Sequence, residues 1–191
     1  GGCNSPHDVL AGDMDGDGRP EVIVRNKDGK LSVYKMAENP RELWTEYPVC
    51  GHVRGDGTAL WDVTGSGYPD IVTAEGFFEN KDGSLKNWKF HSFGMERYGM
   101  DGETRIAVGR LDGERLTVVV TESELSDGAR IMLFTTGDGG MTWEAGTLVG
   151  RDRNFHALHT LRLHDLDGSG LPDIFTAEME NGKTDGLTSK P

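Results

Sequence analysis

The sequence predicts an all-β fold, on the evidence of its glycine content, its short strand-like segments and an internal repeat. Its 191 residues include 28 glycines against 7 prolines, and 35% of them are hydrophobic. This composition is typical of a globular chain with many tight turns, which favour short strands over helices. The segments between the turns, such as LSVYKM and ARIMLFTT, have the length of strands, and no long amphipathic helix interrupts them.

The repeat consists of a strand, an Asp/Gly turn and a second strand, and it occurs four times. Its copies are HDVLAGDMDGDGRPEVIV, TALWDVTGSGYPDIVTAEG, TRIAVGRLDGERLTVVVTES and LHTLRLHDLDGSGLPDIFTAEM. The four turns begin at Asp13, Asp62, Arg110 and Asp165. They are roughly 50 residues apart, which is the length of a four-stranded β-propeller blade. The repeat therefore predicts a β-propeller.

The segments between the repeats supply the remaining strands of each blade. Glycine-containing turns that suit hairpins lie at residues 26–29, 80–83 and 137–140, because glycine adopts positive φ at little cost. We expect one domain over residues 1–191, with blades at 5–50, 56–93, 103–150 and 156–191. The fourth unit stops after two strands, so the sequence predicts about three and a half blades, as a fragment or open arc of a larger propeller.

The charge and the apolar runs exclude some classes of partner. The formal net charge is −12 and the sequence pI is about 4.9, which disfavours nucleic acid and suits cation binding. The longest apolar runs, such as residues 118–120, are far too short to cross a bilayer. The N-terminus carries no visible signal peptide, so any export signal has been removed. Cys3 and Cys50 are either isolated thiols or a pair.

The first Asp-rich turn has the side chains of a calcium loop. Calcium prefers six to eight oxygen ligands, and alternate residues of a tight loop can direct oxygens inward. The loop offers carboxylates at its positions 1, 3, 5 and 9 and a backbone carbonyl at position 7, from Asp13, Asp15, Asp17, Glu21 and Arg19 respectively. An EF-hand is excluded because position 12 is Val24 and the flanking segments are strand-like.

A second explanation is that these carboxylates only cap tight turns through Asx hydrogen bonds. Four carboxylates within nine residues would repel one another if they were not neutralised, which favours a metal in the first turn.

The other three turns keep this pattern to different degrees. The fourth turn repeats it with Asp165, Asp167, Ser169, the Leu171 carbonyl and Asp173. The second offers Asp62, Thr64, Ser66, the Tyr68 carbonyl and Asp70, so its lower charge predicts a weaker site. The third is shorter and begins with the cation Arg110, so we expect no metal there.

Two motifs resemble those of known repeats. DMDGDGRPE and DLDGSGLPD, with strands on both sides, resemble the FG-GAP or VCBS repeats of integrin alpha-chain propellers and of many secreted bacterial propellers. DVTGSGYPD is a weakened copy, and RLDGERL departs from the pattern. The resemblance implies structural calcium, an extracytoplasmic location, secreted or at the cell surface, and a scaffold that presents loops to a protein or polysaccharide ligand.

The segment 136–143, TGDGGMTW, resembles the Asp-box hairpin of sialidase-like propellers. This resemblance implies that Asp138 bonds backbone amides within the turn and that Trp143 packs in the blade.

A few side chains are candidates for a second activity. His7 and His159 each lie six residues before a strong calcium loop, at the start of strands that line the channel of a propeller. Together with Arg153 and His156 they form a candidate polar funnel for catalysis or a second metal. The alternative is that the histidines only bridge neighbouring strand ends by hydrogen bonds.

The competing interpretation is that the chain is the truncated core of a carbohydrate-active lyase or dehydratase. The chain resembles such propeller enzymes only in fold, and a shared fold does not transfer a mechanism. Trp61 and Trp88 are candidates for stacking on sugar rings. Glu122, Glu124 and Asp127 are expected on a solvated loop. The sequence does not decide whether the protein is an enzyme.

Overall fold

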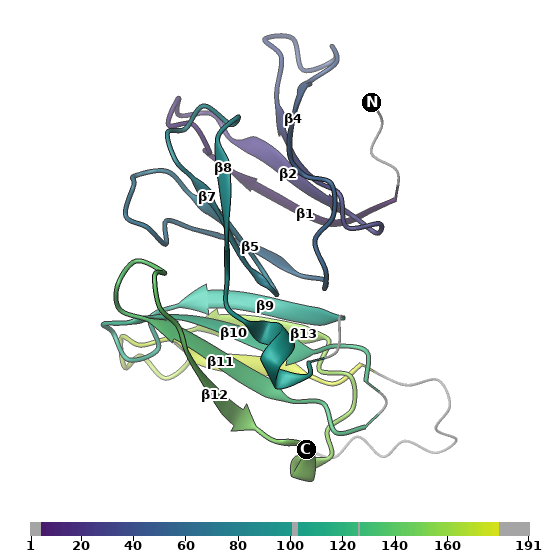
Figure 1. Cartoon of the computed structure of the whole chain (residues 1–191), viewed down its shortest axis with the longest axis vertical. Helices are drawn as coiled ribbons and strands as arrows, with labels where there is room; N and C mark the ends of the chain where they lie inside the picture. Colours follow the sequence, from purple (N-terminus) through teal and green to yellow (C-terminus); the bar gives the residue numbers. More distant parts are fainter. Residues whose placement is uncertain (1–4, 101–102, 126, 180–191) are drawn as a thin grey trace.

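The computed structural model describes residues 5–100, 103–125 and 127–179, and over these ranges nearly all regular structure is antiparallel strand (Figure 1). The first sheet contains β1 (Pro6–Gly12), β2 (Glu21–Asn26), β3 (Leu31–Lys35) and β4 (Thr45–Cys50). The second contains β5 (Thr58–Trp61), β6 (Asp70–Thr73), β7 (Gly76–Asn80) and β8 (Trp88–Ser92). The third contains β9 (Thr104–Gly109), β10 (Leu116–Glu122), β11 (Ile131–Thr136) and β12 (Glu144–Val149).

The fourth sheet has two strands within the described residues, β13 (Thr160–His164) and β14 (Asp173–Ala177). Short 3-10 helices, η1 (Met95–Tyr98) and η2 (Arg151–Arg153), follow the second and third sheets. Strands that are consecutive in the chain are neighbours in each sheet. The prediction of an all-β, propeller-like arc of four-stranded sheets is confirmed, and the described sheets do not close into a ring. Each predicted blade range contains one sheet.

The first strand of each sheet lies beside the first strand of the next, in the order β1, β5, β9 and β13. Hydrogen bonds link neighbouring sheets at these strands. The Gly57 N–H donates to Asp8 Oδ2 at 2.8 Å, and the Thr104 hydroxyl donates to the Asp56 carbonyl at 2.6 Å. Gly57 has φ +89°, and a Cβ there would lie 2.9 Å from the Ile106 backbone nitrogen. Glycine is therefore required where β5 meets β9.

The core consists of apolar layers between successive sheets, and β10 shows how the sequence builds them. All seven of its residues, LTVVVTE, are buried. Val118 and Val120 pack in the cluster shared with the second sheet, whereas Val119 packs in the cluster shared with Leu161 of the fourth. Alternate side chains of a strand point to opposite faces, so a middle strand covered on both faces has buried side chains along its whole length.

The expectation that Glu122 lies on a solvated loop is wrong. Glu122 ends β10, and its side chain is fully buried. Its Oε1 atom accepts hydrogen bonds from the guanidinium groups of Arg130 at 2.8 Å and Arg151 at 3.2 Å. These two cations offset the cost of burying the carboxylate. Glu124 and Asp127 are exposed. Cys50 lies in β4, and its possible partner Cys3 lies outside the described residues.

Candidate metal centres

The first Asp-rich loop connects β1 to β2 and brings three of its predicted ligands together. Carboxylate oxygens of Asp13, Asp15 and Glu21 all lie within 4.8 Å of one another. Asp13 accepts hydrogen bonds from the N–H groups of Gly16 at 2.7 Å and Gly18 at 2.9 Å. Both glycines have positive φ, as a loop this tight requires. The loop thus folds around the carboxylate at its first position.

The last carboxylate of this loop is anchored in the protein interior. Glu21 is the first residue of β2 and is 1% exposed. Its Oε2 atom accepts a hydrogen bond from the Met14 N–H at 2.9 Å. Burial raises the pKa of Glu21, and the charges of Asp15 and Asp17 raise it further. A cation at this position would relieve both effects.

The structure adds a cation that the sequence did not indicate, Lys35 at the end of β3. Its ammonium contacts Asp15, lies 2.7 Å from Asp17 Oδ2 and lies 3.8 Å from Glu21 Oε1. The hydrogen bond from Lys35 lowers the pKa of Asp17, and the contacts with Asp15 and Asp17 raise the pKa of Lys35. Lys35 therefore neutralises part of the repulsion that favoured a metal on sequence grounds.

The structure gives other contacts to the remaining two residues predicted as ligands of the first loop. Asp17 is held by Lys35 and is not among the three converging carboxylates. The Arg19 N–H donates to Asp17 Oδ1 at 2.8 Å, which closes the turn.

The fourth loop connects β13 to β14 and repeats the same arrangement. Carboxylate oxygens of Asp165, Asp167 and Asp173 lie within 4.8 Å of one another. Asp165 accepts N–H hydrogen bonds from Gly168, Ser169 and Gly170, at 2.8, 3.0 and 2.9 Å. These are loop positions 1, 3 and 9 again, so the repeat brings the same three positions together twice.

The carboxylate at loop position 9, which is Asp173 in the fourth turn, accepts a backbone N–H in three of the turns. Asp173 accepts the Leu166 N–H at 2.9 Å, as Glu21 accepts the Met14 N–H. The Ser169 hydroxyl accepts the Leu171 N–H at 3.3 Å, and hydrogen bonds from Ser169 lower the pKa of Asp167.

The second loop keeps the fold of the turn with fewer charges. Asp62 accepts N–H hydrogen bonds from Ser66 and Gly67, both at 2.9 Å. Asp70 is fully buried and accepts the N–H groups of Val63 at 2.9 Å and Asn80 at 2.8 Å. Burial raises the pKa of Asp70 to about 6. The other predicted ligands are neutral, and their contacts are local: Thr64 Oγ1 lies 3.5 Å from Asp70, and Ser66 Oγ lies 3.3 Å from the Tyr68 carbonyl oxygen.

The third turn is closed by its own cations. Asp112 accepts the N–H groups of Glu114 at 3.0 Å and Arg115 at 2.7 Å, and the Arg115 Nε–H at 2.9 Å. The Arg110 guanidinium donates to the Glu114 carbonyl. The hydrogen bonds from Arg115 and from the Glu114 N–H lower the pKa of Asp112 to about 2.

The two three-carboxylate clusters suit calcium by the chemistry of their donors. Calcium and other hard cations prefer carboxylate and carbonyl oxygens, whereas zinc sites use histidine and cysteine. Each cluster contains carboxylates alone.

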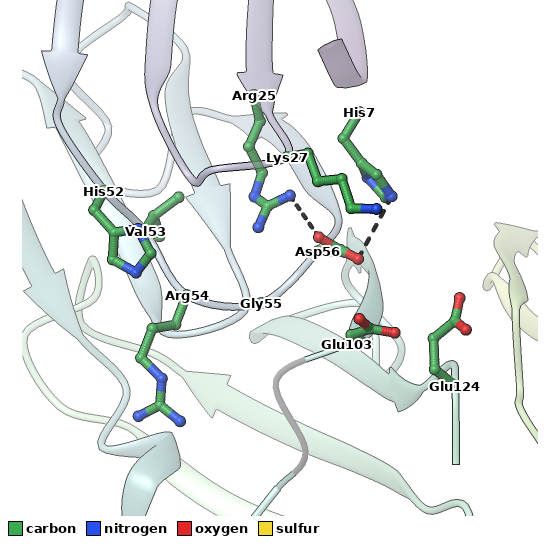
Figure 2. A pocket seen from close by; sticks show the side chains of 10 residues that line it. All are labelled: His7, Arg25, Lys27, His52, Val53, Arg54, Gly55, Asp56, Glu103 and Glu124. Carbon is green, nitrogen blue, oxygen red and sulfur yellow. Dashed lines mark hydrogen bonds and ion pairs between the residues drawn. The ribbon is translucent and has the colours of Figure 1, made fainter. Parts of the chain in front are cut away.

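The channel-face candidates divide into separate groups. His7 lies in β1, where its Nδ1 is 3.3 Å from Asp8 Oδ1 and its Nε2 is 3.6 Å from Asp56 Oδ2. It lines a pocket that Figure 2 shows from close by. Asp56 stands six residues before the second loop, as His7 does before the first. That equal offset was the sequence signal that could have found it.

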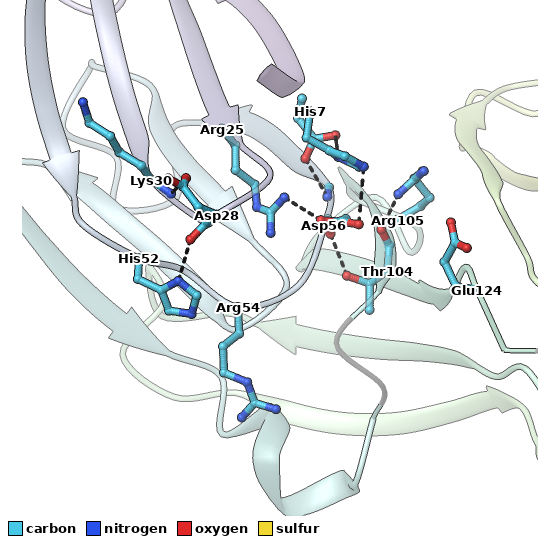
Figure 3. A network of polar contacts seen from close by, with 12 residues as sticks. His7, Arg25, Asp28, Lys30, His52, Arg54, Asp56, Thr104, Arg105 and Glu124 are labelled. Carbon is cyan, nitrogen blue, oxygen red and sulfur yellow. Dashed lines mark hydrogen bonds and ion pairs between the residues drawn. The ribbon is translucent and has the colours of Figure 1, made fainter. Parts of the chain in front are cut away.

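His159 has different partners. The Arg105 guanidinium donates to its Nε2 at 2.6 Å, and Glu124 Oε1 lies 3.4 Å from the same atom. Figure 3 shows Arg105 and Glu124 beside the network around Asp56. Within the part of the chain that the structure describes, no hydrogen bond joins His7 to His159.

The two upstream candidates are also apart from His7. Arg153 is exposed in η2, and the His156 N–H donates to Glu178 Oε1 at 2.6 Å. Neither residue lines the pocket that contains His7. Of the four candidates, His7 lines this pocket and the other three do not, and catalysis by these residues stays a hypothesis.

The hairpin between β11 and β12 has the contacts expected of Asp138. Its Oδ1 accepts the N–H groups of Met141 and Thr142, each at 3.0 Å, and the hydrogen bonds around it lower its pKa to about 2. Trp143 donates to the Gly140 carbonyl at 3.1 Å and packs on Phe93. Its assignment as an Asp-box stays a prediction. Trp61 and Trp88 are half-buried against apolar clusters.

Fold and loops together define a propeller-like all-β protein in which an Asp-containing turn joins the first two strands of each described sheet. Residues 13–73 match the family model of the FG-GAP-like repeat, from the first carboxylate of the first loop to the end of β6. The chain therefore contains an FG-GAP-like repeat, which confirms the resemblance seen in its loop motifs. No curated protein matches the chain. The described residues include no helix long and apolar enough to span a membrane.

Proposed function

We propose that the protein is a calcium-binding scaffold, with one ion held by the first loop and one by the fourth. The observation that carries this proposal is the convergence of carboxylates from loop positions 1, 3 and 9 in two copies of the repeat. All three carboxylates also accept backbone N–H groups of their own turns, as turn capping would require. Capping by itself would not require the three charges to meet within 4.8 Å of one another, where they repel.

Calcium in these loops would have a structural role. Position 1 follows the first strand of its sheet, and position 9 begins the second strand, as Asp13 and Glu21 do. An ion bound to both would tie the two strands together at their hairpin. Asp13, Asp15 and Glu21 would hold it in the first loop, and Asp165, Asp167 and Asp173 in the fourth. The second loop, with only Asp62 and Asp70 charged, would bind calcium more weakly.

The scaffold would act outside the cytoplasm and present its loops to a protein or polysaccharide ligand. The FG-GAP-like repeat supports this location and a protein ligand. Extracellular calcium modules bind their ion at roughly 10⁻⁴ to 10⁻³ M, so calcium would stabilise the protein after export. The net charge of −12 argues against nucleic acid as the partner.

Thermal unfolding with and without calcium tests the proposal. A ligand that binds only the folded state stabilises it by RT ln(1+[L]/Kd), which is about 1–2 kcal/mol per site at about 5 mM calcium for these affinities. Each kcal/mol corresponds to a Tm increase of about 2–4 °C in a domain of this size. We expect EDTA to lower the Tm accordingly.

The matched control is the double variant Asp15→Asn/Asp167→Asn, which removes one charged ligand from each loop and keeps an oxygen at both positions. Its Tm should respond to calcium much less than that of the wild type. A wild-type Tm that is the same in EDTA and in calcium, or an equal response in the double variant, would contradict the proposal.

A further inference from the structure

A pocket of about 430 Å³ lies at the end of the inner strands away from the calcium loops (Figure 2). His7, near the start of β1, lines it, whereas the first calcium loop follows the end of that seven-residue strand. The two sites are therefore roughly 20 Å apart along β1, at about 3.3 Å per residue. No ligand of the calcium loops lines the pocket.

The lining has as many lysines and arginines as acidic residues, whereas the chain as a whole has 32 acidic residues against 20 lysines and arginines. Its cations are Arg25, Lys27 and Arg54, and His7 and His52 add two imidazoles. Three others are acidic, and Val53 supplies the one apolar side chain of the lining. Such a lining suits a small polar ligand better than an apolar one.

Arg25 gives the most specific indication of what binds there. It is 4% exposed, and its guanidinium points from β2 towards Asp56, to which its Nη1 atom donates at 2.5 Å (Figure 2). Its Nε atom is buried and has no hydrogen-bond partner among the described residues. A buried donor without an acceptor is costly. The guanidinium edge that carries Nε is one to which a carboxylate can bind through two parallel hydrogen bonds.

The acidic lining residues complement this cation. Glu103 and Glu124 lie on the side away from His52 and Arg54 in Figure 2. An ionised carboxylate accepts hydrogen bonds and cannot donate them, so these residues suit hydroxyl groups of a ligand. The pocket thus offers donors to an anion at one side and acceptors to hydroxyls at the other.

We propose that this pocket binds a small hydroxylated carboxylate, such as a sugar acid. Arg25 takes the carboxylate, Arg54 adds positive charge beside it, and Glu103 and Glu124 accept hydrogen bonds from its hydroxyl groups. The volume falls within the roughly 300–1,000 Å³ of small-molecule sites. This ligand is separate from the calcium ions of the proposed function and does not depend on them.

Isothermal titration of the calcium-loaded chain with D-glucuronate tests this inference, with D-glucose and inorganic sulfate as probes that lack the carboxylate or the hydroxyls. We expect glucuronate to bind at least about tenfold more tightly than either, a difference of about 1.4 kcal/mol. Equal binding of the three probes, or no binding of glucuronate at about 50 mM, a free energy near −2 kcal/mol, would overturn the proposal. In that case the charged residues of the pocket would serve only to hold neighbouring strands together.

Variants locate the binding in the pocket. Arg54→Gln should weaken glucuronate binding several-fold, and its side chain is 62% exposed, so the fold should tolerate the change. The control is Arg41→Gln, which removes an exposed arginine outside the pocket. Equal effects of the two variants would overturn the assignment.

Two further experiments distinguish a free acid from the end of a glycan as the ligand, and test whether this proposal is independent of calcium binding. A disaccharide that ends in glucuronate should bind more tightly than glucuronate if the ligand is the end of an acidic glycan, and no more tightly if it is a free acid. Glucuronate should still bind the folded Asp15→Asn/Asp167→Asn variant, so a failure of calcium binding would leave this result intact. Loss of glucuronate binding in that folded variant would overturn the independence of the two sites.

Discussion

The first and fourth loops bring the same three positions together, yet they differ in how the protein treats the resulting charge. In the first loop, Lys35 reaches from β3 to Asp15, Asp17 and Glu21. In the fourth, no lysine or arginine of the described chain forms an ion pair with Asp165, Asp167 or Asp173. The repeat therefore specifies where the carboxylates meet, and residues outside the turn decide how strongly the site needs an added cation.

In the third turn, the turn itself supplies the cation that neutralises its carboxylate. The Asp112 carboxylate accepts hydrogen bonds from the Arg115 side chain and from two backbone N–H groups. A turn that supplies its own cation does not need a metal to offset this charge. Calcium dependence should accordingly be largest in the fourth loop, smaller in the first and absent in the third.

The largest effect is expected for Asp167→Asn, which removes a charged ligand from the loop that has no cation of its own. Calcium affinity of the fourth loop should fall by about 100-fold, or about 2.7 kcal/mol, while the first loop keeps its affinity. NMR signals of Gly170 and Gly18 during a calcium titration report on the two loops separately. The comparison fails if both loops lose affinity equally.

Lys35→Met should act in the opposite direction, and only on the first loop. Because the ammonium occupies the space among three carboxylates, its removal should raise the calcium affinity of that loop by about tenfold. The same change should lower stability in EDTA, since the carboxylates then repel one another. Lys30→Met is the matched control, because Lys30 lies just before the start of β3 and pairs with Glu46. An unchanged affinity in Lys35→Met would show that the lysine does not compete with calcium.

Hydrogen exchange should separate the loops without any substitution. Calcium should slow exchange of the Gly168 and Gly16 amides, which donate to the first carboxylate of their loops. The amides of Glu114 and Arg115 should exchange at the same rate in EDTA and in calcium, because Asp112 holds them in either case. Equal slowing of all three turns would indicate a general stabilisation instead of local binding.

The smallest effect concerns acid titration of the third turn. The folded pKa of Asp112, about 2, lies below its unfolded value near 3.9. The carboxylate therefore contributes stability that is fully present above about pH 4 and is lost as the pH falls through about 2. Carboxyl NMR shifts should show this low midpoint, and Arg115→Gln should raise it. A wild-type midpoint near 4 would show that the turn is not closed by Asp112.

The fold and the meeting of the loop carboxylates could be predicted because their signals are local. Each turn lies within nine residues, and the repeat of about 50 residues shows that neighbouring units are alike. The carboxylates of Asp13 and Asp15 could thus be expected to meet that of Glu21 before any strand was placed.

The missed features depend on contacts between residues far apart in the chain. Lys35 is 20 residues from Asp15 and reaches it only through the register of β2 and β3, in which Val22 pairs with Tyr34. Glu122 was assigned to solvent because it begins an acidic segment, but Arg130 and Arg151 cover it in the folded chain. Which cation neutralises a carboxylate is a property of the tertiary structure and is not visible in a short motif.

Equilibrium dialysis of the EDTA-treated protein against calcium tests the central claim most directly, because it counts the ions that the chain binds. At about 5 mM free calcium, well above the affinities typical of extracellular modules, the wild type should bind about two ions per chain, with a third if the second loop fills. Asp15→Asn/Asp167→Asn should bind markedly fewer under the same conditions. A wild type that binds no calcium, or a double variant that binds as much as the wild type, would contradict the assignment of these loops as calcium sites.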